Sequence, residues 1–244
     1  MPINVFPLDT IRRILEGGQS VCQQAGIPIA GGHTIDSVEP IYGLVVLGLA
    51  HPKKIKRNAD ARVGDRLVLG KPLGVGVLSA ALKKNALSPD QYHQMVATAT
   101  QLNTPGPDLA AIAGVHALTD VTGFGLAGHA LEMARGAGAD IHLDLARVPL
   151  LDGVRDLVQQ GMITGASARN WSAYGHEVIL GSQLTPIDQA LLTDPQTSGG
   201  LLVACTPDAA TEVIKTFERH GFARAAEIGQ IKTAAKTEPR LLVC

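Results

Sequence analysis

The segment with the strongest chemical signal is TDVTGFGLAG, residues 119–128. Three of its glycines match the pattern GxGxxG: Gly123, Gly125 and Gly128. Asp144 follows the first of them by 21 residues, which is the spacing of a nicotinamide dinucleotide site. Asp120 weighs against that interpretation, because a carboxylate beside an incoming pyrophosphate costs on the order of several kcal/mol. A cation between the carboxylate and the pyrophosphate turns this repulsion into attraction, since Mg²⁺ binds one or two carboxylates together with phosphate oxygens. The sequence therefore favours Asp120 as a magnesium ligand, with capping of the next helix and a nicotinamide site as alternatives.

A second candidate for binding an anion is Gly32, His33 and Thr34, in the run GGHT. Paired glycines let the backbone approach an anion and aim N–H groups at it, and the hydroxyl and imidazole add donors. These residues alone favour a plain turn over a phosphate site. Gly70-Lys71 is not a P-loop, because Pro72 stands where that motif has Ser or Thr. The run DPQTSGG, residues 194–200, leads into a strand, so it is either a loop lining a cleft or a structural turn.

Apolar spacing predicts the elements that must position these residues. Helices are expected at 7–25, 75–83, 88–102, 108–114, 126–135, 149–158 and 208–220. Strands are expected at 27–30, 41–50, 66–70, 116–119, 140–145, 201–205, 226–231 and 240–243. The β-branched run Ile41–Ala50 is expected to be buried on both faces. Helices and strands that alternate irregularly along the chain indicate an α+β fold, a mixed α/β sandwich whose sheet is covered by helices.

The composition excludes several classes of protein. The 244 residues carry a formal net charge of −1 and three cysteines. A net charge so close to zero does not favour binding to nucleic acid, and no apolar run is long enough to cross a membrane. Unpaired cysteines indicate a reducing compartment, so we expect a cytoplasmic protein. The charged run at 51–65 marks a boundary between a domain at 1–62 and one at 63–244. Its basic cluster favours a solvated connection over an anion site, and comprises Lys53, Lys54, Lys56 and Arg57.

Five segments in the same order resemble one family: AGGHTID, GKPLGVGVL, LTDVTGFGLAGH, RNWSAYGH and DPQTSGGLL. The chain is similar to the selenophosphate synthetases (selenide, water dikinases), which belong to the PurM-like, aminoimidazole-ribonucleotide-synthetase-like superfamily. The resemblance implies a PurM-like C-terminal domain preceded by a partial N-terminal α/β domain. It implies that ATP, selenide and water give selenophosphate, AMP and phosphate. It also implies Mg²⁺ on Asp120, and phosphate contacts from Gly32, His33 and Thr34 across a homodimer interface. No catalytic residue is assigned, and the polar residues expected near the cleft are Asn170, Thr197 and Ser198.

The sequence departs from the family pattern at its start. Family members carry a nucleophilic cysteine or selenocysteine, a nearby lysine and further metal-binding aspartates in an N-terminal segment that has no match here. None of Cys22, Cys205 and Cys244 matches that nucleophile, so we expect this chain by itself to lack full activity. An apolar edge at Ile41–Ala50 would favour a dimer. The alternatives are another ATP-using member of the superfamily, such as a thiamine-monophosphate kinase or a hydrogenase-maturation protein, and a non-catalytic protein that is either an oligomeric scaffold or a nucleotide-binding remnant.

Overall fold

The computed structural model describes residues 1–235, 238 and 240–244, and the side chains of all of these except Lys53. The chain forms two compact units, Met1–His51 and Pro52–Cys244. The predicted domain boundary after residue 62 stays a prediction.

The first unit contains one helix, α1 (Leu8–Gln24), as its only regular element among the described residues. Ile11 and Cys22 are buried on its apolar stripe, and the chain leaves the helix through Gly26 with φ of +68°. The strands predicted at 27–30 and 41–50 are wrong, because residues 27–51 form neither helix nor strand. The run Ile41–Ala50 is exposed along its whole length rather than buried on both faces. A strand forms only by pairing with a neighbour, and none of the described residues pairs with this run.

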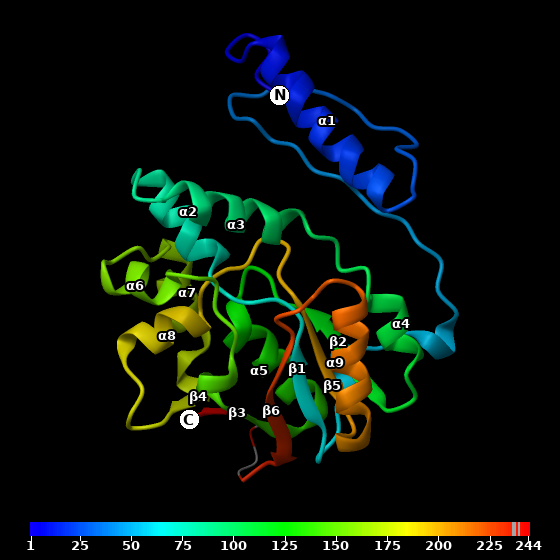
Figure 1. Ribbon diagram of the computed structural model, residues 1–244, viewed down its shortest axis with the longest axis vertical. Helices are drawn as coiled ribbons and strands as arrows, with labels where there is room; N and C mark the ends of the chain where they lie inside the picture. Colours follow the sequence, from blue (N-terminus) through cyan, green and yellow to red (C-terminus); the bar gives the residue numbers. More distant parts are fainter. Residues whose placement is uncertain (236–237, 239) are drawn as a thin grey trace. The chain divides into compact units, whose positions relative to one another are not determined.

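The second unit is built on a mixed sheet with the strand order β2-β5-β1-β6-β3-β7-β4 (Figure 1). The strands are β1 (Arg66–Leu69), β2 (Val115–Asp120), β3 (Ala139–Leu143), β4 (Val178–Leu180), β5 (Leu201–Cys205), β6 (Ala226–Thr233) and β7 (Leu241–Val243). Strand β5 is antiparallel to β1 and β2, and β6 is antiparallel to β1 and β3. The short strand β7 pairs in parallel with both β3 and β4. The predicted α+β sandwich is confirmed.

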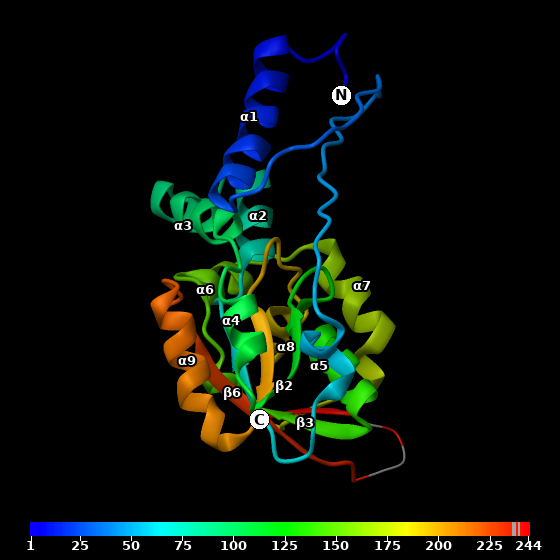
Figure 2. The same ribbon diagram turned by 90° about the vertical axis from the view of Figure 1, so that its right-hand side faces the viewer.

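Helices cover both faces of this sheet, with α5 on one side and α9 on the other (Figure 2), and side chains that alternate along the strands pack against them. Leu67 and Leu69 of β1 belong to the cluster with α5 (Gly125–Ala137), whereas Val68 belongs to the cluster with α9 (Ala210–Arg219). This two-residue period places every other side chain of a strand on the same face. The central strands are therefore apolar at successive positions because a helix covers each face.

A third apolar cluster joins α2 (Val75–Lys83), α6 (Val154–Gln159) and α8 (Pro186–Leu192). The remaining α-helices are α3 (Pro89–Thr100), α4 (Gly106–Ala111) and α7 (Gly165–Tyr174). Five 3₁₀ turns complete the described elements, at Pro52–Lys54, Asn58–Asp60, Leu145–Arg147, Gly175–Glu177 and Pro207–Ala209. The sequence analysis missed α7, β4 and α8. The start of α8 had a readable signal, because Thr185, Pro186 and Asp188 form a capping box with proline at the first turn.

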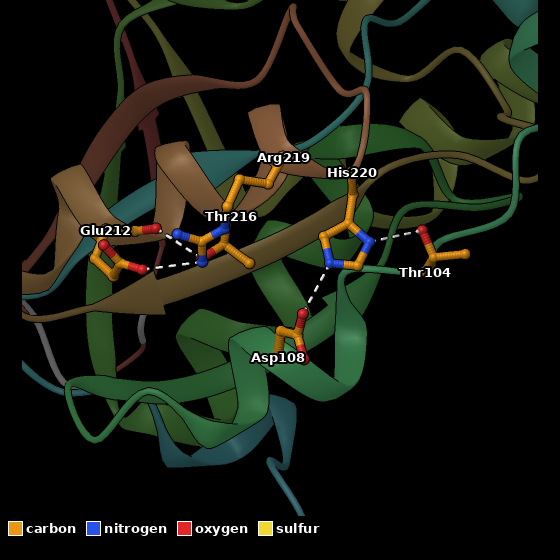
Figure 3. A network of polar contacts seen from close by, with 6 residues as sticks. All are labelled: Thr104, Asp108, Glu212, Thr216, Arg219 and His220. Carbon is orange, nitrogen blue, oxygen red and sulfur yellow. Dashed lines mark hydrogen bonds and ion pairs between the residues drawn. The ribbon is translucent and has the colours of Figure 1, made fainter.

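A polar network ties α4 to the end of α9 (Figure 3). The imidazole of His220 contacts Asp108 Oδ2 through Nε2 at 2.8 Å and Thr104 Oγ1 through Nδ1 at 3.0 Å. Arg219 binds Glu212 and Thr216 on α9 itself. Thr104 follows Asn103, whose amide nitrogen donates to the carbonyl of Gly199 at 2.9 Å. The network therefore anchors a loop that touches the glycine pair before β5.

No helix among the described residues is long and apolar enough to cross a membrane.

Candidate functional site

Three loops of the second unit meet at one edge of the sheet. Strands β1 and β2 end there and β5 begins there, because β5 runs antiparallel to both. The loops are residues 70–74 after β1, 121–124 after β2 and 193–200 before β5. They contain most of the residues of three motifs from the sequence analysis, although those motifs lie far apart along the chain. Sheet topology, rather than proximity in sequence, brings them together.

Asp120 is the last residue of β2 and pairs with Leu201 at this edge. The residue is exposed, and no described residue donates a hydrogen bond or forms an ion pair with its carboxylate. The alternative that Asp120 caps the next helix is wrong, since α5 begins only at Gly125 and its N-cap is Phe124 without a side-chain cap. A carboxylate with no partner in the fold, held at the end of a paired strand, is available to a cation.

The glycines of the GxGxxG pattern have different environments. A Cβ on Gly123 would meet no described atom within 4 Å. A Cβ on Gly125, by contrast, would lie 2.7 Å from the carbonyl oxygen of Leu192, and its φ is +70°. Gly125 therefore serves the packing of α5 on the end of α8, and only Gly123 borders open space beside Asp120.

The nicotinamide alternative is wrong on topology. Strands β5, β1 and β6 lie between β2 and β3, whereas a dinucleotide fold places the two strands side by side. Asp144, the expected ribose ligand, instead accepts a hydrogen bond from the backbone of Ala146 at 3.1 Å and caps a 3₁₀ turn. Asp144 thus has a structural role, and its spacing of 21 residues from Gly123 does not mark a ribose ligand.

Two side chains of α7 hold the loop after β2. The amide nitrogen of Asn170 donates to the carbonyls of Gly123 at 2.9 Å and Thr193 at 3.0 Å. The hydroxyl of Tyr174 donates to the carbonyl of Phe124 at 2.5 Å, and burial raises the pKa of this phenol. Asn170 is buried, so its expected place among the residues facing a cleft is wrong. It braces the loop from beneath, and Thr197 and Ser198 are the exposed members of that set.

Gln196 is the centre of the contacts among the three loops. Its Oε1 accepts from the backbone N–H of Gly74 at 3.1 Å and of Val75 at 3.2 Å, at the start of α2. Its Nε2 donates to the carbonyl and to Oδ2 of Asp194, both at 2.8 Å. Its own N–H donates to the carbonyl of Thr122 at 3.0 Å. One buried amide therefore fixes the loop after β2 against the loop after β1.

Asp194 is a buried carboxylate in this network, with 1% of its surface exposed. Its Oδ2 also accepts from the N–H of Gly76 at 3.1 Å, but Oδ1 has no hydrogen-bond partner among the described residues. Burial raises the pKa of Asp194 to about 7, and the hydrogen bonds from Gln196, Val77 and Gly76 oppose that rise. The carboxyl group is thus close to half-protonated at neutral pH.

Lys71 is buried as well, with 1% of its surface exposed. Its ammonium donates to three carbonyls, of Gln101 and Ser198 at 2.6 Å each and of Thr98 at 3.2 Å. Burial lowers the pKa of Lys71 to about 8. Since three acceptors satisfy its three donors, Lys71 clamps the 193–200 loop to the end of α3 and does not face a phosphate. The clamp holds Ser198 in a left-handed conformation, with φ of +51°.

Gly32, His33 and Thr34 lie in the first unit, in an exposed segment without regular structure. They line a pocket of about 680 Å³ with Met1, Leu15 and Tyr42 among its other walls. A Cβ on Gly31 or Gly32 would meet no described atom within 4 Å. Packing within the unit does not explain these glycines, and open space of this kind fits a ligand that approaches the backbone.

The chemistry of Asp120 fits Mg²⁺, which takes oxygen ligands and keeps several waters beside one or two carboxylates. Within the described part of the chain, no group of three or more His, Cys, Asp or Glu side chains is placed to hold a metal ion. Asp120 would therefore supply one ligand, and phosphate oxygens and water the others.

Comparison with known proteins accounts for both units. The model of the AIR synthase related protein, N-terminal domain, matches residues 2–50, and the C-terminal domain of the same family matches residues 62–241. The selenide, water dikinase of Dechloromonas aromatica is 57% identical over 239 residues, which is 98% of this chain and 68% of that protein. The chain belongs to the selenide, water dikinase family. The relative from Burkholderia orbicola is 64% identical over 231 residues, 95% of this chain and 65% of that protein. The chain thus spans about 65% of the length of the first relatives of this family.

Solved structures agree on the PurM-like fold of this family. Escherichia coli HypE, a hydrogenase maturation protein, has a TM-score of 0.68 at 20% identity, covering 97% of this chain and 66% of that one. The thiamine-monophosphate kinase of Stenotrophomonas maltophilia has a TM-score of 0.53 at 17% identity, covering 77% of this chain and 52% of that one. At such identities the likeness shows the fold alone. The two alternatives drawn from the superfamily are therefore not favoured over the selenide, water dikinases.

Proposed function

We propose that this protein takes part in the synthesis of selenophosphate from selenide, ATP and water, with AMP and phosphate as the other products. The observation that carries the proposal is the 57–64% identity to proteins named selenide, water dikinase along nearly the whole chain. A protein of the same fold, HypE, has been crystallised in complex with ATP, which agrees with ATP as the substrate. Three cysteines without a disulfide agree with the cytoplasm as its compartment.

Asp120 is proposed as the ligand of Mg²⁺ on the polyphosphate. Bound there, the ion would neutralise phosphate charge, which is the main demand of phosphoryl transfer. The residues of this chain supply position: β2 holds the carboxylate at the sheet edge, and Asn170 and Gln196 fix the backbone of the loop that follows. Gly32, His33 and Thr34 are proposed to donate to phosphate oxygens of the ATP bound by the second copy of a homodimer.

The test is a comparison of wild type with Asp120→Asn. Calorimetry should detect binding of Mg·ATP to this chain, and ³¹P NMR should detect AMP, phosphate and selenophosphate when the full-length form is given ATP, Mg²⁺ and selenide. Asp120→Asn should abolish both signals without changing the unfolding midpoint, because no described residue forms a hydrogen bond or an ion pair with the carboxylate. Asp152→Asn is the matched control, an exposed aspartate whose loss should leave both signals intact. Binding of ATP without Mg²⁺ dependence would contradict the role of Asp120, and absence of ATP binding would favour the non-catalytic alternative.

A homodimer is proposed on the exposed apolar run Ile41–Ala50, whose backbone donors and acceptors are free to pair with a second copy. Sedimentation at micromolar concentration should give a dimer or a larger oligomer. A monomer would refute this part of the proposal and leave the chemistry untouched.

A further inference from the structure

We propose that the second unit carries a separate anion site, at the sheet edge opposite Asp120, which takes a dianionic phosphate group. The site is a pocket of about 360 Å³ whose walls include Lys56, Arg62 and His116. Val115, at its floor, begins the strand that Asp120 ends. Asp120 lies five positions after Val115 along an extended strand, so the two sites lie about 17 Å apart.

Lys56 is held in the wall of the pocket instead of extending into solvent. Its ammonium donates to the carbonyl of Val115 at 2.7 Å, and the residue is half-buried. An ammonium has three donors, so the remaining two are available to a ligand. The charged run around Lys56 is thus not only a solvated connection, because one of its lysines is fixed on the folded body.

His116 supplies a ring nitrogen in a fixed position in the same pocket wall. Its Nδ1 lies 2.9 and 3.0 Å from the two carboxylate oxygens of Asp65, whose side chain is 3% exposed. Asp65 also accepts from the backbone N–H of Arg62 at 2.9 Å. The pair fixes the plane of the imidazole and leaves Nε2 as its free ring nitrogen, a donor when the ring is protonated.

The charges around the pocket favour an anion. Asp60 is the one carboxylate among the described lining residues, and Arg57 already binds it, with Nε–Oδ2 at 2.9 Å and Nη2–Oδ1 at 2.5 Å. The guanidinium of Arg62 makes no hydrogen bond to a described residue. A guanidinium binds a phosphate through two parallel N–H donors, and an ammonium binds it as a point charge. Lys56 and Arg62 together therefore match one doubly charged phosphate group.

The experiment titrates the whole chain with inorganic phosphate and, in a separate arm, with phenyl phosphate. Amide and imidazole resonances are followed by NMR, and affinities are measured by calorimetry. We expect saturable shifts at Val115 and His116, and at least a tenfold loss of affinity in Lys56→Met with Arg62→Gln. Tighter binding of phenyl phosphate would identify a phosphomonoester as the ligand, and equal binding the free ion.

The matched control is Lys54→Met, which removes one positive charge from an exposed neighbour outside the pocket and is compared with Lys56→Met alone. An equal loss of affinity in this control would refute the site, since the effect would then be long-range attraction. Shifts confined to Asp120 or to Gly32–Thr34, or none at all, would refute it as well. If the double variant fails to fold, His116→Gln takes its place, with the same tenfold expectation and the same control.

Discussion

The substitution Asp194→Asn should stabilise the second unit at neutral pH and change the way its stability depends on pH. Burial raises the pKa of Asp194 from an ordinary value of 3.8 to about 7. The folded state therefore holds a proton that the unfolded state releases across this interval, so the free energy of unfolding falls as pH rises. At 1.36 kcal/mol for each pH unit, ionisation of this group costs about 4 kcal/mol by pH 7, of which about 2 kcal/mol arises between pH 5 and pH 7.

An asparagine carries no charge to bury. Its carbonyl oxygen can replace Oδ2 and keep the bonds from Gly76 and Gln196. Its amide nitrogen would then replace Oδ1, the atom without a partner, and leave a buried donor unpaired at a cost of about 1–3 kcal/mol. At pH 8 we therefore expect a net gain of about 1–3 kcal/mol in the free energy of unfolding.

The assay is urea unfolding followed by tryptophan fluorescence from pH 5 to pH 8. Trp171 is the single tryptophan of the chain and packs on the core of the second unit, so its emission reports that unit. The difference between Asp194→Asn and wild type should grow by about 3 kcal/mol over this range. A difference that stays constant with pH would refute the reasoning, because it would mean that Asp194 ionises normally.

Asp188→Asn is the matched control. Burial tends to raise the pKa of Asp188, but hydrogen bonds from Thr185 and Arg155 outweigh it and lower the pKa below 3.8. Stability from this group is fully present above its unfolded pKa and is lost only as pH falls through the lowered value. The control should therefore be destabilised by a constant amount from pH 5 to pH 8.

Gly125→Ala should lose at least 2 kcal/mol of stability, roughly the cost of a left-handed backbone conformation plus the cost of a clash between the new Cβ and the backbone. Gly123→Ala should stay within about 0.5 kcal/mol of wild type, because a Cβ there meets no described atom. Equal losses in urea unfolding would show that the two glycines do not differ. Phe217→Ala should cost about 3–5 kcal/mol, because this residue of α9 is fully buried in the apolar cluster between the helix and the sheet. A loss below about 1 kcal/mol would contradict that packing. Iodoacetamide at pH 8 should label the exposed Cys244 first. Cys205 should react only after unfolding, since burial raises the pKa of its thiol to about 12. Mass spectrometry of native and urea-unfolded samples tests this order.

Local patterns were enough to predict most elements of the second unit. Arg66–Leu69 and Leu201–Cys205 form strands, and Val75–Lys83 forms a helix with the predicted bounds. Their apolar periods are local properties that packing reinforces. Ile41–Ala50 is rich in Leu, Val and Ile, as β1 and β5 are, but it forms no strand, because pairing requires a second segment at the right distance.

The residue types and their order were enough to identify the groups that could bind a ligand, namely the carboxylate of Asp120 and the paired glycines before His33. They were also enough to identify the family that shares these motifs. Only the tertiary structure decided what each polar group does. Lys71 and Asn170 donate their hydrogen bonds to backbone carbonyls, and Asp144 caps a 3₁₀ turn far across the sheet from β2. The reason is physical, since a residue type fixes which hydrogen bonds a side chain can make, whereas burial and the neighbours brought by sheet topology fix which of them it makes.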